Sequence, residues 1–317
     1  MDKTRVTRNR PLVPKVAPKV AARLVLAALI FSPLASAQTA PPQSATSKQT
    51  NTAPAPAPAV DVDGWGPSTN APEKSQQSAP APRHDISGTW APANGALDGG
   101  GFAGAKNMPE DGKPEHRLPF TALGLETYNR TKPTIGPRMV LTAETNDPEA
   151  MCDPQGMPRE DLFQLRETQI VQTPESVVIL YQYDRIWRVI WADGRKLPQD
   201  PEPRWFGYSV GKWVDDYTFV AETSGTDERT WLDLVGRPQS ADLRVEERFH
   251  RVDRDNLELT VTIDDPKMYT KTWVALDKFP MKLLPASFDV REMICSPSEA
   301  AAYNKLIADP ASEKGPQ

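Results

Sequence analysis

Residues 207–211 have the spacing in this chain that most suggests covalent chemistry. They read Gly-Tyr-Ser-Val-Gly, which matches the G-x-S-x-G turn that presents the nucleophile of serine hydrolases between a strand and a helix. Acidic residues and then His250 follow Ser209, so the chain order serine, acid, histidine is available. However, residues 212–216 indicate a strand that runs into a turn, where the hydrolase motif requires a helix. We therefore interpret the segment as a strand whose glycines leave space for a bulky neighbour, and keep catalysis by Ser209 and His250 as an alternative.

Aromatic residues concentrated in one part of the chain form a second candidate site, for ligand binding. Aromatic side chains line many ligand pockets, although a well-packed β core explains them equally well. Two arginines on predicted strands could hold a carboxylate or phosphate if their faces line a cavity, whereas on a solvent face they would form weak surface pairs. The residues predicted to line a pocket are Arg188, Trp205, Trp213, Trp231, Arg248, Tyr269 and Trp273.

The histidines and cysteines predict no metal site. His84, His116 and His250 are far apart and lack the spacing of metal ligands, so we expect neither a metal nor another cofactor. Cys152 and Cys295 flank the predicted strands, and two cysteines in an exported chain favour a disulfide. Such a bond would stabilise the domain by roughly 4 kcal/mol and would join the first and last strands.

Alternating apolar and polar residues predict a sequence of short strands. The segments with this pattern are 85–90, 177–183, 184–191, 207–213, 217–221, 243–250, 257–264, 270–276 and 288–294. Short helices are expected at 119–129 and at 298–308, the second with Ser298 as N-cap. About eight strands without helical crossovers predict an all-β fold. We expect a single antiparallel β-barrel, lipocalin-like and with minor helices, because closure removes exposed edges; a β-sandwich is the alternative.

The composition divides the chain into four parts. Residues 1–37 have a basic start, an apolar core at Leu24–Phe31 and small residues before Gln38, which is the pattern of a cleaved signal peptide. The apolar run is too short to cross a membrane, so no transmembrane segment is expected after cleavage. Residues 38–83 are rich in Pro, Ala and Gln and predict a disordered linker. Residues 84–297 would form the β domain and 298–317 a C-terminal helix and tail, in a protein that is exported to the periplasm or beyond.

The charge of the chain argues against nucleic acid as a partner. The whole chain carries 37 basic and 42 acidic residues, and removing residues 1–37 leaves 30 basic and 41 acidic residues, a net charge of −11. Binding to phosphate backbones requires clustered Lys and Arg, which this composition does not offer. The sequence predicts no oligomeric state.

Several segments resemble a family of uncharacterised exported bacterial proteins. The matching stretches read Asp-Ile-Ser-Gly-Thr-Trp at 85–90, Cys-Asp-Pro-Gln-Gly-Met-Pro-Arg at 152–159, Gly-Tyr-Ser-Val-Gly-Lys-Trp at 207–213, Arg-Thr-Trp-Leu-Asp at 229–233, Val-Glu-Glu-Arg-Phe at 245–249 and Thr-Ile-Asp-Asp-Pro-Lys-Met-Tyr-Thr at 262–270. The resemblance implies a histidine where this chain has Tyr208, and it implies no activity. Gly88-Thr89-Trp90 is also similar to the first strand of lipocalins, which implies an apolar ligand in the barrel.

The sequence thus favours a non-catalytic envelope protein that binds a small apolar or amphipathic ligand in a barrel pocket. A secreted serine hydrolase that uses Ser209 is one alternative. A structural or assembly factor of the cell envelope, with the linker as its working part, is the other.

Overall fold

The computed structural model describes residues 78–93, 104–162 and 165–310. The strands are β1 (Gly88–Pro92), β2 (Thr168–Gln172), β3 (Ser176–Tyr181), β4 (Trp187–Trp191), β5 (Tyr208–Trp213), β6 (Thr218–Ser224), β7 (Arg244–Arg251), β8 (Asn256–Asp264) and β9 (Trp273–Leu283). The helices are α1 (Ala122–Arg130), α2 (Arg159–Leu162) and α3 (Pro297–Tyr303), with short turns of helix η1 (Pro114–His116), η2 (Thr142–Glu144), η3 (Pro148–Met151) and η4 (Asn304–Ala308). The predicted signal peptide at 1–37 and most of the predicted linker lie outside the described residues.

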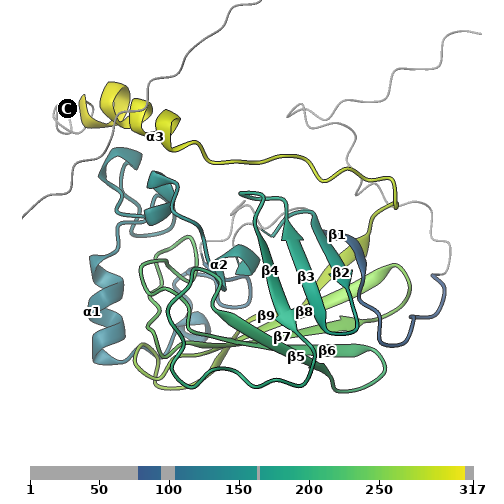
Figure 1. The fold of residues 1–317 in the computed structure, drawn as a ribbon. Coiled ribbons are helices and arrows are strands. Elements are labelled where there is room, and N and C mark those ends of the chain that lie inside the picture. The colour runs from purple at the N-terminus through teal and green to yellow at the C-terminus, as the bar shows by residue number, and fades with distance from the viewer. Residues whose placement is uncertain (1–77, 94–103, 163–164, 311–317) are drawn as a thin grey trace, which may run out of the picture. The chain divides into compact units, whose positions relative to one another are not determined.

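The nine strands of the described part form one closed barrel in sequence order (Figure 1). β1 closes the barrel by pairing with both β2 and β9, which places Gly88 opposite Ile170 and Trp90 opposite Leu283. This confirms the predicted barrel, and the β-sandwich alternative is wrong. The expectation of purely antiparallel pairing needs one correction, because β4 and β5 run parallel. Residues 192–207 carry the chain back along the barrel between these two strands.

The strict alternation of side chains decides which residues fill the barrel. Along β8, Leu257, Leu259, Val261 and Ile263 are all buried, while the residues between them are partly exposed. This pattern arises because successive side chains of a strand point to opposite faces. Gly211 on β5 is part of the same packing, since a Cβ atom there would lie 2.3 Å from the Phe219 ring. The glycine does leave space for a bulky neighbour, as its position in the motif predicts.

Two predicted elements near the C-terminus differ from the structure. Residues 288–294 do not form a strand; Met293 makes only an isolated bridge to Tyr183, and β9 instead continues to Leu283. The C-terminal helix is present, but it begins at Pro297, so its N-cap is Ser296 rather than Ser298. The Ser296 side chain makes no capping hydrogen bond within the described residues.

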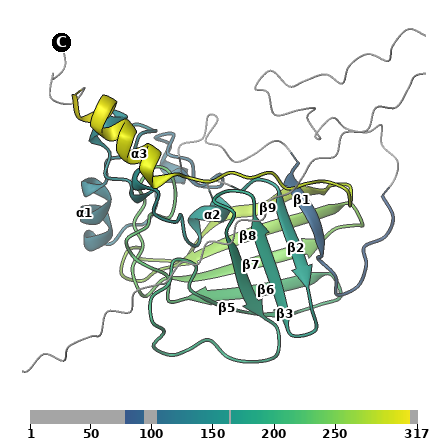
Figure 2. The ribbon, with the colours of Figure 1, turned by 45° about the horizontal axis from the view of Figure 1, so that its top comes forward.

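The two ends of the barrel differ greatly in the length of their connections. At one end, which we call the short-turn end, the strands are joined by residues 173–175, 214–217 and 252–255. At the other, the loop-rich end, the connections are residues 93–167, 182–186, 225–243 and 265–272. Helices α1, α2 and α3 lie on the same side of the strands in both views (Figures 1 and 2). Most of the described residues that do not build the barrel therefore belong to connections at the loop-rich end.

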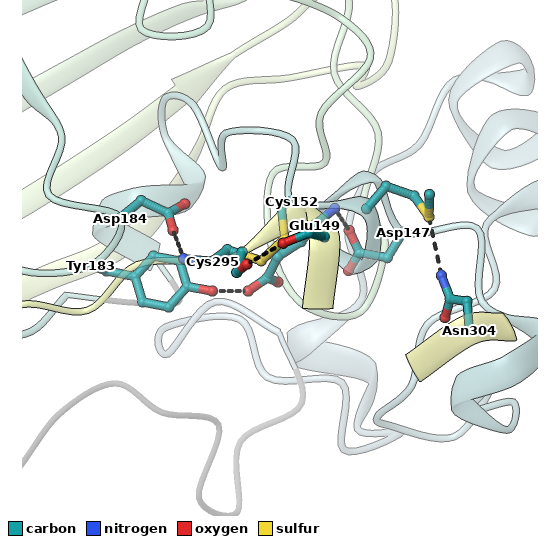
Figure 3. The surroundings of a disulfide bond; sticks show 10 residues. Asp147, Glu149, Cys152, Tyr183, Asp184, Cys295 and Asn304 are labelled. Carbon is teal, nitrogen blue, oxygen red and sulfur yellow. Dashed lines mark hydrogen bonds between the residues drawn. A yellow bond between two sulfur atoms is a disulfide. The ribbon is translucent and has the colours of Figure 1, made fainter. Parts of the chain in front are cut away.

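The predicted disulfide between Cys152 and Cys295 is present. It spans 143 residues of sequence, for which the chain-entropy model gives a stabilisation of about 5 kcal/mol. The prediction that it joins the first and last strands is wrong, because Cys152 follows η3 and Cys295 lies in the segment between β9 and α3 (Figure 3). The backbone N–H of Cys295 also donates to Asp184, 3.3 Å away. The disulfide thus attaches the C-terminal segment to the loop-rich end.

The last residues of the predicted linker belong to the folded part. Ser78 donates a 2.7 Å hydrogen bond to Asp253, in the turn between β7 and β8, and the backbone N–H of Arg254 donates to Ala79. Arg83 forms a 2.8 Å ion pair with Asp216. The boundary placed at residue 83 is therefore too late by at least these six residues. None of the helices in the described ranges has the length and apolar character that a membrane span requires.

Candidate functional site

A pocket of about 290 Å³ lies at the loop-rich end, beside the barrel rather than inside it. Its lining comes from the segment before α1, from α1 itself and from the β6–β7 connection: Pro109, Glu110, Gly112, Lys113, His116, Arg117, Leu118, Phe120, Tyr128 and Arg237. Among the described residues, none from a strand lines it. The volume is at the lower limit for small-molecule sites, so it suits a small ligand.

The position of α1 shapes this pocket. Thr121 caps the helix by accepting from the N–H of Gly124 at 2.9 Å, and it is joined to the β8–β9 connection through hydrogen bonds to Lys267 and Met268. Gly124 allows the closest approach, since a Cβ atom there would lie 2.0 Å from the carbonyl oxygen of Met268. The helix therefore lies directly on the connection, which fixes Tyr128 in the pocket wall.

Arg237 provides a buried cation in the pocket. Its side chain is 3 % exposed and its Nη1 donates to Asp233 at 3.1 Å. The guanidinium lies 5.9 Å from the Trp273 ring, and Gly104 leaves room for it, since a Cβ atom there would be 2.9 Å from Nη1. Within the described part of the chain, its Nε and Nη2 make no hydrogen bond. These nitrogens are left as donors, in a fork geometry that suits a carboxylate or phosphate.

Tyr128 and Glu110 form the acidic part of the pocket wall. The Tyr128 hydroxyl donates to Glu110 Oε1, and burial together with this carboxylate raises the pKa of Tyr128. The other carboxylate oxygen, Oε2, is buried and has no hydrogen-bond partner among the described residues. The Tyr128 ring is stacked on Phe120, with ring centroids 5.0 Å apart. The wall therefore combines an aromatic surface with one unsatisfied acceptor.

A histidine and two further cations lie on the rim. His116 Nδ1 lies 2.9 Å from Asp111, and Lys113 forms a 3.1 Å ion pair with the same carboxylate. The pKa of Asp111 is lowered, with the hydrogen bond to His116 as the largest cause. Arg117 is exposed and forms no ion pair with a described residue. Lys113 and Arg237 thus have acidic partners, while Arg117 and two nitrogens of Arg237 remain for a ligand.

A second group of charged residues is buried inside the barrel. Arg188 on β4 and Glu247 on β7 form an ion pair across the interior, with side chains 3 % and 0 % exposed. Asp161 and Glu160, from α2, complete this cluster with Tyr181 of β3, and all are buried. Nε and Nη1 of Arg188, Oε2 of Glu247 and the Tyr181 hydroxyl have no hydrogen-bond partner within the described residues.

Burial dominates the protonation of this cluster. It raises the pKa of Glu160 well above the usual value, and it does the same for Asp161, where the nearby Glu247 carboxylate adds to the shift. Raised pKa values of this kind keep carboxyl groups neutral in the interior. Arg188 is then balanced by one carboxylate, and the cluster carries no large net charge. It is closed to solvent, so it serves as a polar core beneath α2 rather than as an open site.

The structure separates the residues that sequence predicted for one pocket. Arg188 lies in the closed cluster. Trp231 packs against Arg159, whose guanidinium carbon lies 5.5 Å from the centroid of the Trp231 ring. Arg248 points outward, where it pairs with Glu246 at 3.5 Å. Trp205 lies beside Arg229, and Trp213 packs on Phe219 and His84. These five residues do not line the 290 Å³ pocket.

Tyr269 and Trp273 come nearest to the prediction. They pack edge to face with centroids 5.5 Å apart, and Tyr269 also contacts Phe120 of the pocket wall. Both are buried behind the pocket and support its wall without lining it. The aromatic residues of the sequence are therefore divided between core, loops and surface, because alternation alone does not reveal which face of a strand points inward.

The arrangement that a serine hydrolase would need is not formed. Ser209 and its cross-strand partner Thr223 point into the barrel, and their hydroxyls are 2.8 Å apart. The partner of Thr223 on β7 is Val245, and His250 lies five residues further along, which is roughly 16 Å at about 3.3 Å per residue. An odd separation also puts His250 on the outer face, where it contacts Thr218. Two residues on opposite faces of a sheet cannot act as nucleophile and base.

Sequence reasoning missed the pocket residues because they lie in irregular connections. Glu110, Arg117 and Arg237 carry no periodic pattern, and His116 was considered only as a metal ligand. The spacing between His116 and Asp111, five residues apart, was the one feature of the sequence that could have indicated the pocket. No group of three or more histidine, cysteine or carboxylate side chains that could hold a metal ion occurs among the described residues.

Comparisons with known proteins do not assign this chain to a family. No family model matches the chain, and neither the curated proteins nor the solved structures contain a significant match. The resemblance to exported bacterial proteins therefore stays a prediction. Any function has to be inferred from the residues of the site.

Proposed function

We propose that this protein is a non-catalytic, exported binding protein for a small amphipathic molecule that carries an anionic group. The observation that supports this most directly is Arg237, a buried guanidinium in a small pocket, with two nitrogens that make no hydrogen bond to a described residue. An arginine held in this way is pre-organised for a carboxylate or phosphate.

The shape of the pocket supports an apolar body for the ligand. Leu118 and the stacked rings of Phe120 and Tyr128 form one wall, and the volume of about 290 Å³ leaves room for a single ring or a short chain. Sites of this kind combine apolar walls with a few polar groups that fix orientation. The ligand lies beside the barrel in this proposal, because the interior of the barrel is occupied by its own side chains.

Export is part of the proposal. The signal-like pattern of residues 1–37 supports it, and the disulfide between Cys152 and Cys295 fits an oxidising compartment.

Isothermal titration calorimetry with 3-phenylpropionate, and with its uncharged amide, tests this function. The purified protein should bind the acid at least tenfold more tightly than the amide, because the ion pair with Arg237 requires the charge. Arg237→Met should remove this preference. Should that variant unfold, Arg117→Glu tests the same attraction on the exposed rim, where it should weaken binding of the acid without affecting the fold.

The chain offers a matched control. Arg195 also binds an aspartate, Asp193, and lies 3.7 Å from the centroid of a tryptophan, Trp191, but at the surface and away from the pocket. Arg195→Ala should leave binding unchanged. Equal affinity for acid and amide, or no heat of binding with either, would contradict the proposed function.

A further inference from the structure

We propose that the outer face of strands β2, β3 and β4 binds an extended, neutral polysaccharide of β-1,4-linked sugar rings, which stacks on Trp187 and Trp191. This inference goes beyond the proposed function, because none of the residues that line the pocket belongs to these strands. It concerns a second site on the outside of the barrel, and it holds or fails whatever the ligand of the pocket is.

The first argument is the exposure of two tryptophans on β4. Trp187 is 62 % exposed, although tryptophan is highly buried in most proteins. Trp191 is 37 % exposed and lies on the same face, four residues further along the strand. At about 3.3 Å per residue, the two side chains are roughly 13 Å apart along β4. One straight chain of sugar rings can therefore lie over both, with a different ring on each tryptophan.

The second argument is that the face around the tryptophans is continuous and uncharged. Leu180 lies opposite Trp187, and Val178 lies opposite both Val189 and Val171. The outward residues of the three strands are Gln169, Val171, Ser176, Val178, Leu180, Trp187, Val189 and Trp191. None of them is charged. The three strands lie side by side in both views, away from α1 and α3 (Figures 1 and 2).

This lack of charge favours a neutral partner. On β7 and β8, by contrast, the outward residues include Glu246, Arg248 and Glu258. A face without charges offers no ion pair to an acidic or basic partner, so it gains nothing from a charged one. Arg195 lies 3.7 Å from the centroid of the Trp191 ring, but Asp193 holds and neutralises it.

The size of the face favours a single chain of sugar rings over another protein. Strands rise about 3.3 Å per residue and lie about 4.8 Å apart, so five residues on three strands cover roughly 250 Å². A stable contact between proteins covers about 800 Å² on each partner. A second copy of this chain would need contacts well beyond these strands. In that direction charge returns, because Val210 of β5 is paired with the exposed Glu222 of β6.

The types of residue on the face suit sugar rings. Aromatic rings stack against the C–H faces of pyranose rings, whose hydroxyl groups bond to neutral polar side chains. Gln169 lies in the same cross-strand row as Trp187, and Ser176 lies opposite Trp191. Each tryptophan thus has an uncharged hydrogen-bonding group in its row. A β-1,4 linkage keeps successive rings in a line, as two platforms on one strand require, whereas an α-1,4 linkage curves the chain.

Calorimetric titration of the full protein with three hexasaccharides tests this inference. Cellohexaose and chitohexaose are β-1,4-linked, and maltohexaose has the same glucose units as cellohexaose in an α-1,4-linked chain. At least one of the two β-linked sugars should bind at least tenfold more tightly than maltohexaose. The corresponding disaccharide, cellobiose or chitobiose, is too short to reach both tryptophans and should bind at least tenfold more weakly than its hexasaccharide.

Two variants assign the binding to this face. Trp187→Ala should weaken binding of the preferred hexasaccharide at least tenfold, and Trp191→Ala should weaken it less, because Arg195 already covers part of that ring. Both side chains are exposed, so thermal unfolding should show that the variants keep their fold. Tyr303→Ala is the matched control, since Tyr303 is an aromatic residue of α3 that is 46 % exposed and lies away from these strands. It should retain the full affinity.

The outcomes either support or overturn the inference. Failure of both β-linked hexasaccharides to bind, or equal affinity for maltohexaose, would overturn it and leave the proposed function intact. Binding that survives in both tryptophan variants would place the sugar elsewhere on the molecule. Sedimentation velocity covers the remaining occupant: a dimer that Trp187→Ala converts to a monomer would show that a second copy covers this face, and would also overturn the inference.

Discussion

The two ends of the barrel each bury an arginine, and they do so in opposite ways. At the short-turn end, Arg251 donates through all three nitrogens to backbone carbonyls, those of Asp85, Ser87, Asp253 and Arg254. At the loop-rich end, Arg188 uses one nitrogen for Glu247 and leaves two without a partner among the described residues. Hydrogen bonds to backbone carbonyls do not change with pH, whereas the charge of a carboxyl group does.

This contrast shows where the molecule places its ionisable groups. The short-turn end is held by local turns and by a satisfied guanidinium, so its stability derives from close packing. The loop-rich end holds the buried carboxyl groups, the disulfide and the pocket. Unsatisfied buried polar groups lower stability, and they are retained most often where they serve a site.

The largest effect is expected at Arg188. Arg188→Met should lower the free energy of unfolding by about 3–5 kcal/mol, because it leaves Glu247 buried without a cation. Glu247→Gln should cost less, since Asp161 lies near enough to ionise and neutralise Arg188. Urea unfolding monitored by tryptophan fluorescence measures both. Equal losses for the two variants would show that Asp161 does not share this role.

The second effect is a loss of stability with rising pH, which is expected at the loop-rich end because the raised pKa values of buried carboxyl groups lie there. Because the pKa of Asp161 is raised in the folded protein, its contribution is present below the ordinary aspartate value and is lost as the pH rises through the folded pKa. Asp161→Asn removes this loss. Above about pH 4, the variant should gain on the unmodified protein by up to about 1.4 kcal/mol per pH unit.

Urea unfolding at a series of pH values between 4 and 8 checks this prediction. Arg251→Met is the comparison from the short-turn end, and its loss of stability should be the same at every pH. A constant difference between Asp161→Asn and the unmodified protein would contradict the raised pKa.

The smallest effect is expected at the surface of the short-turn end. Arg83→Ala removes an ion pair with Asp216 in which both side chains are well exposed, at 71 % and 39 %. Such pairs contribute little because water and salt screen them, so the free energy of unfolding should be unchanged within the error of the measurement. Thermal unfolding measures it. A larger loss would mean that residues 78–83 contribute to the core of this end.

Much of the barrel was predictable, and the reason is visible in particular strands. Residues 257–264 alternate so regularly that both the strand and its buried face follow from sequence. Residues 184–191 show the limit of the same method. Their alternation predicted a strand, but the exposed tryptophans and the buried Arg188 reverse what hydrophobicity alone favours. Arg188 can point inward only because Glu247, 59 residues later, lies opposite to it.

The parallel pairing of β4 with β5 was also beyond local reasoning. Asp-Gly at 193–194 is typical of a tight hairpin turn, whereas residues 192–207 return along the barrel before β5 begins. A turn signal reports only the local direction of the chain, so it does not determine which strand becomes the neighbour.

The sequence by itself determined the class of fold, the order of most strands and the pairing of two cysteines, because each depends on local periodicity or on composition. The tertiary structure alone decided the site. Glu110, Tyr128 and Arg237 come from three irregular or helical segments that meet only when α1 lies on the β8–β9 connection. A pocket built from connections depends on long-range packing, and that packing has no period in the sequence.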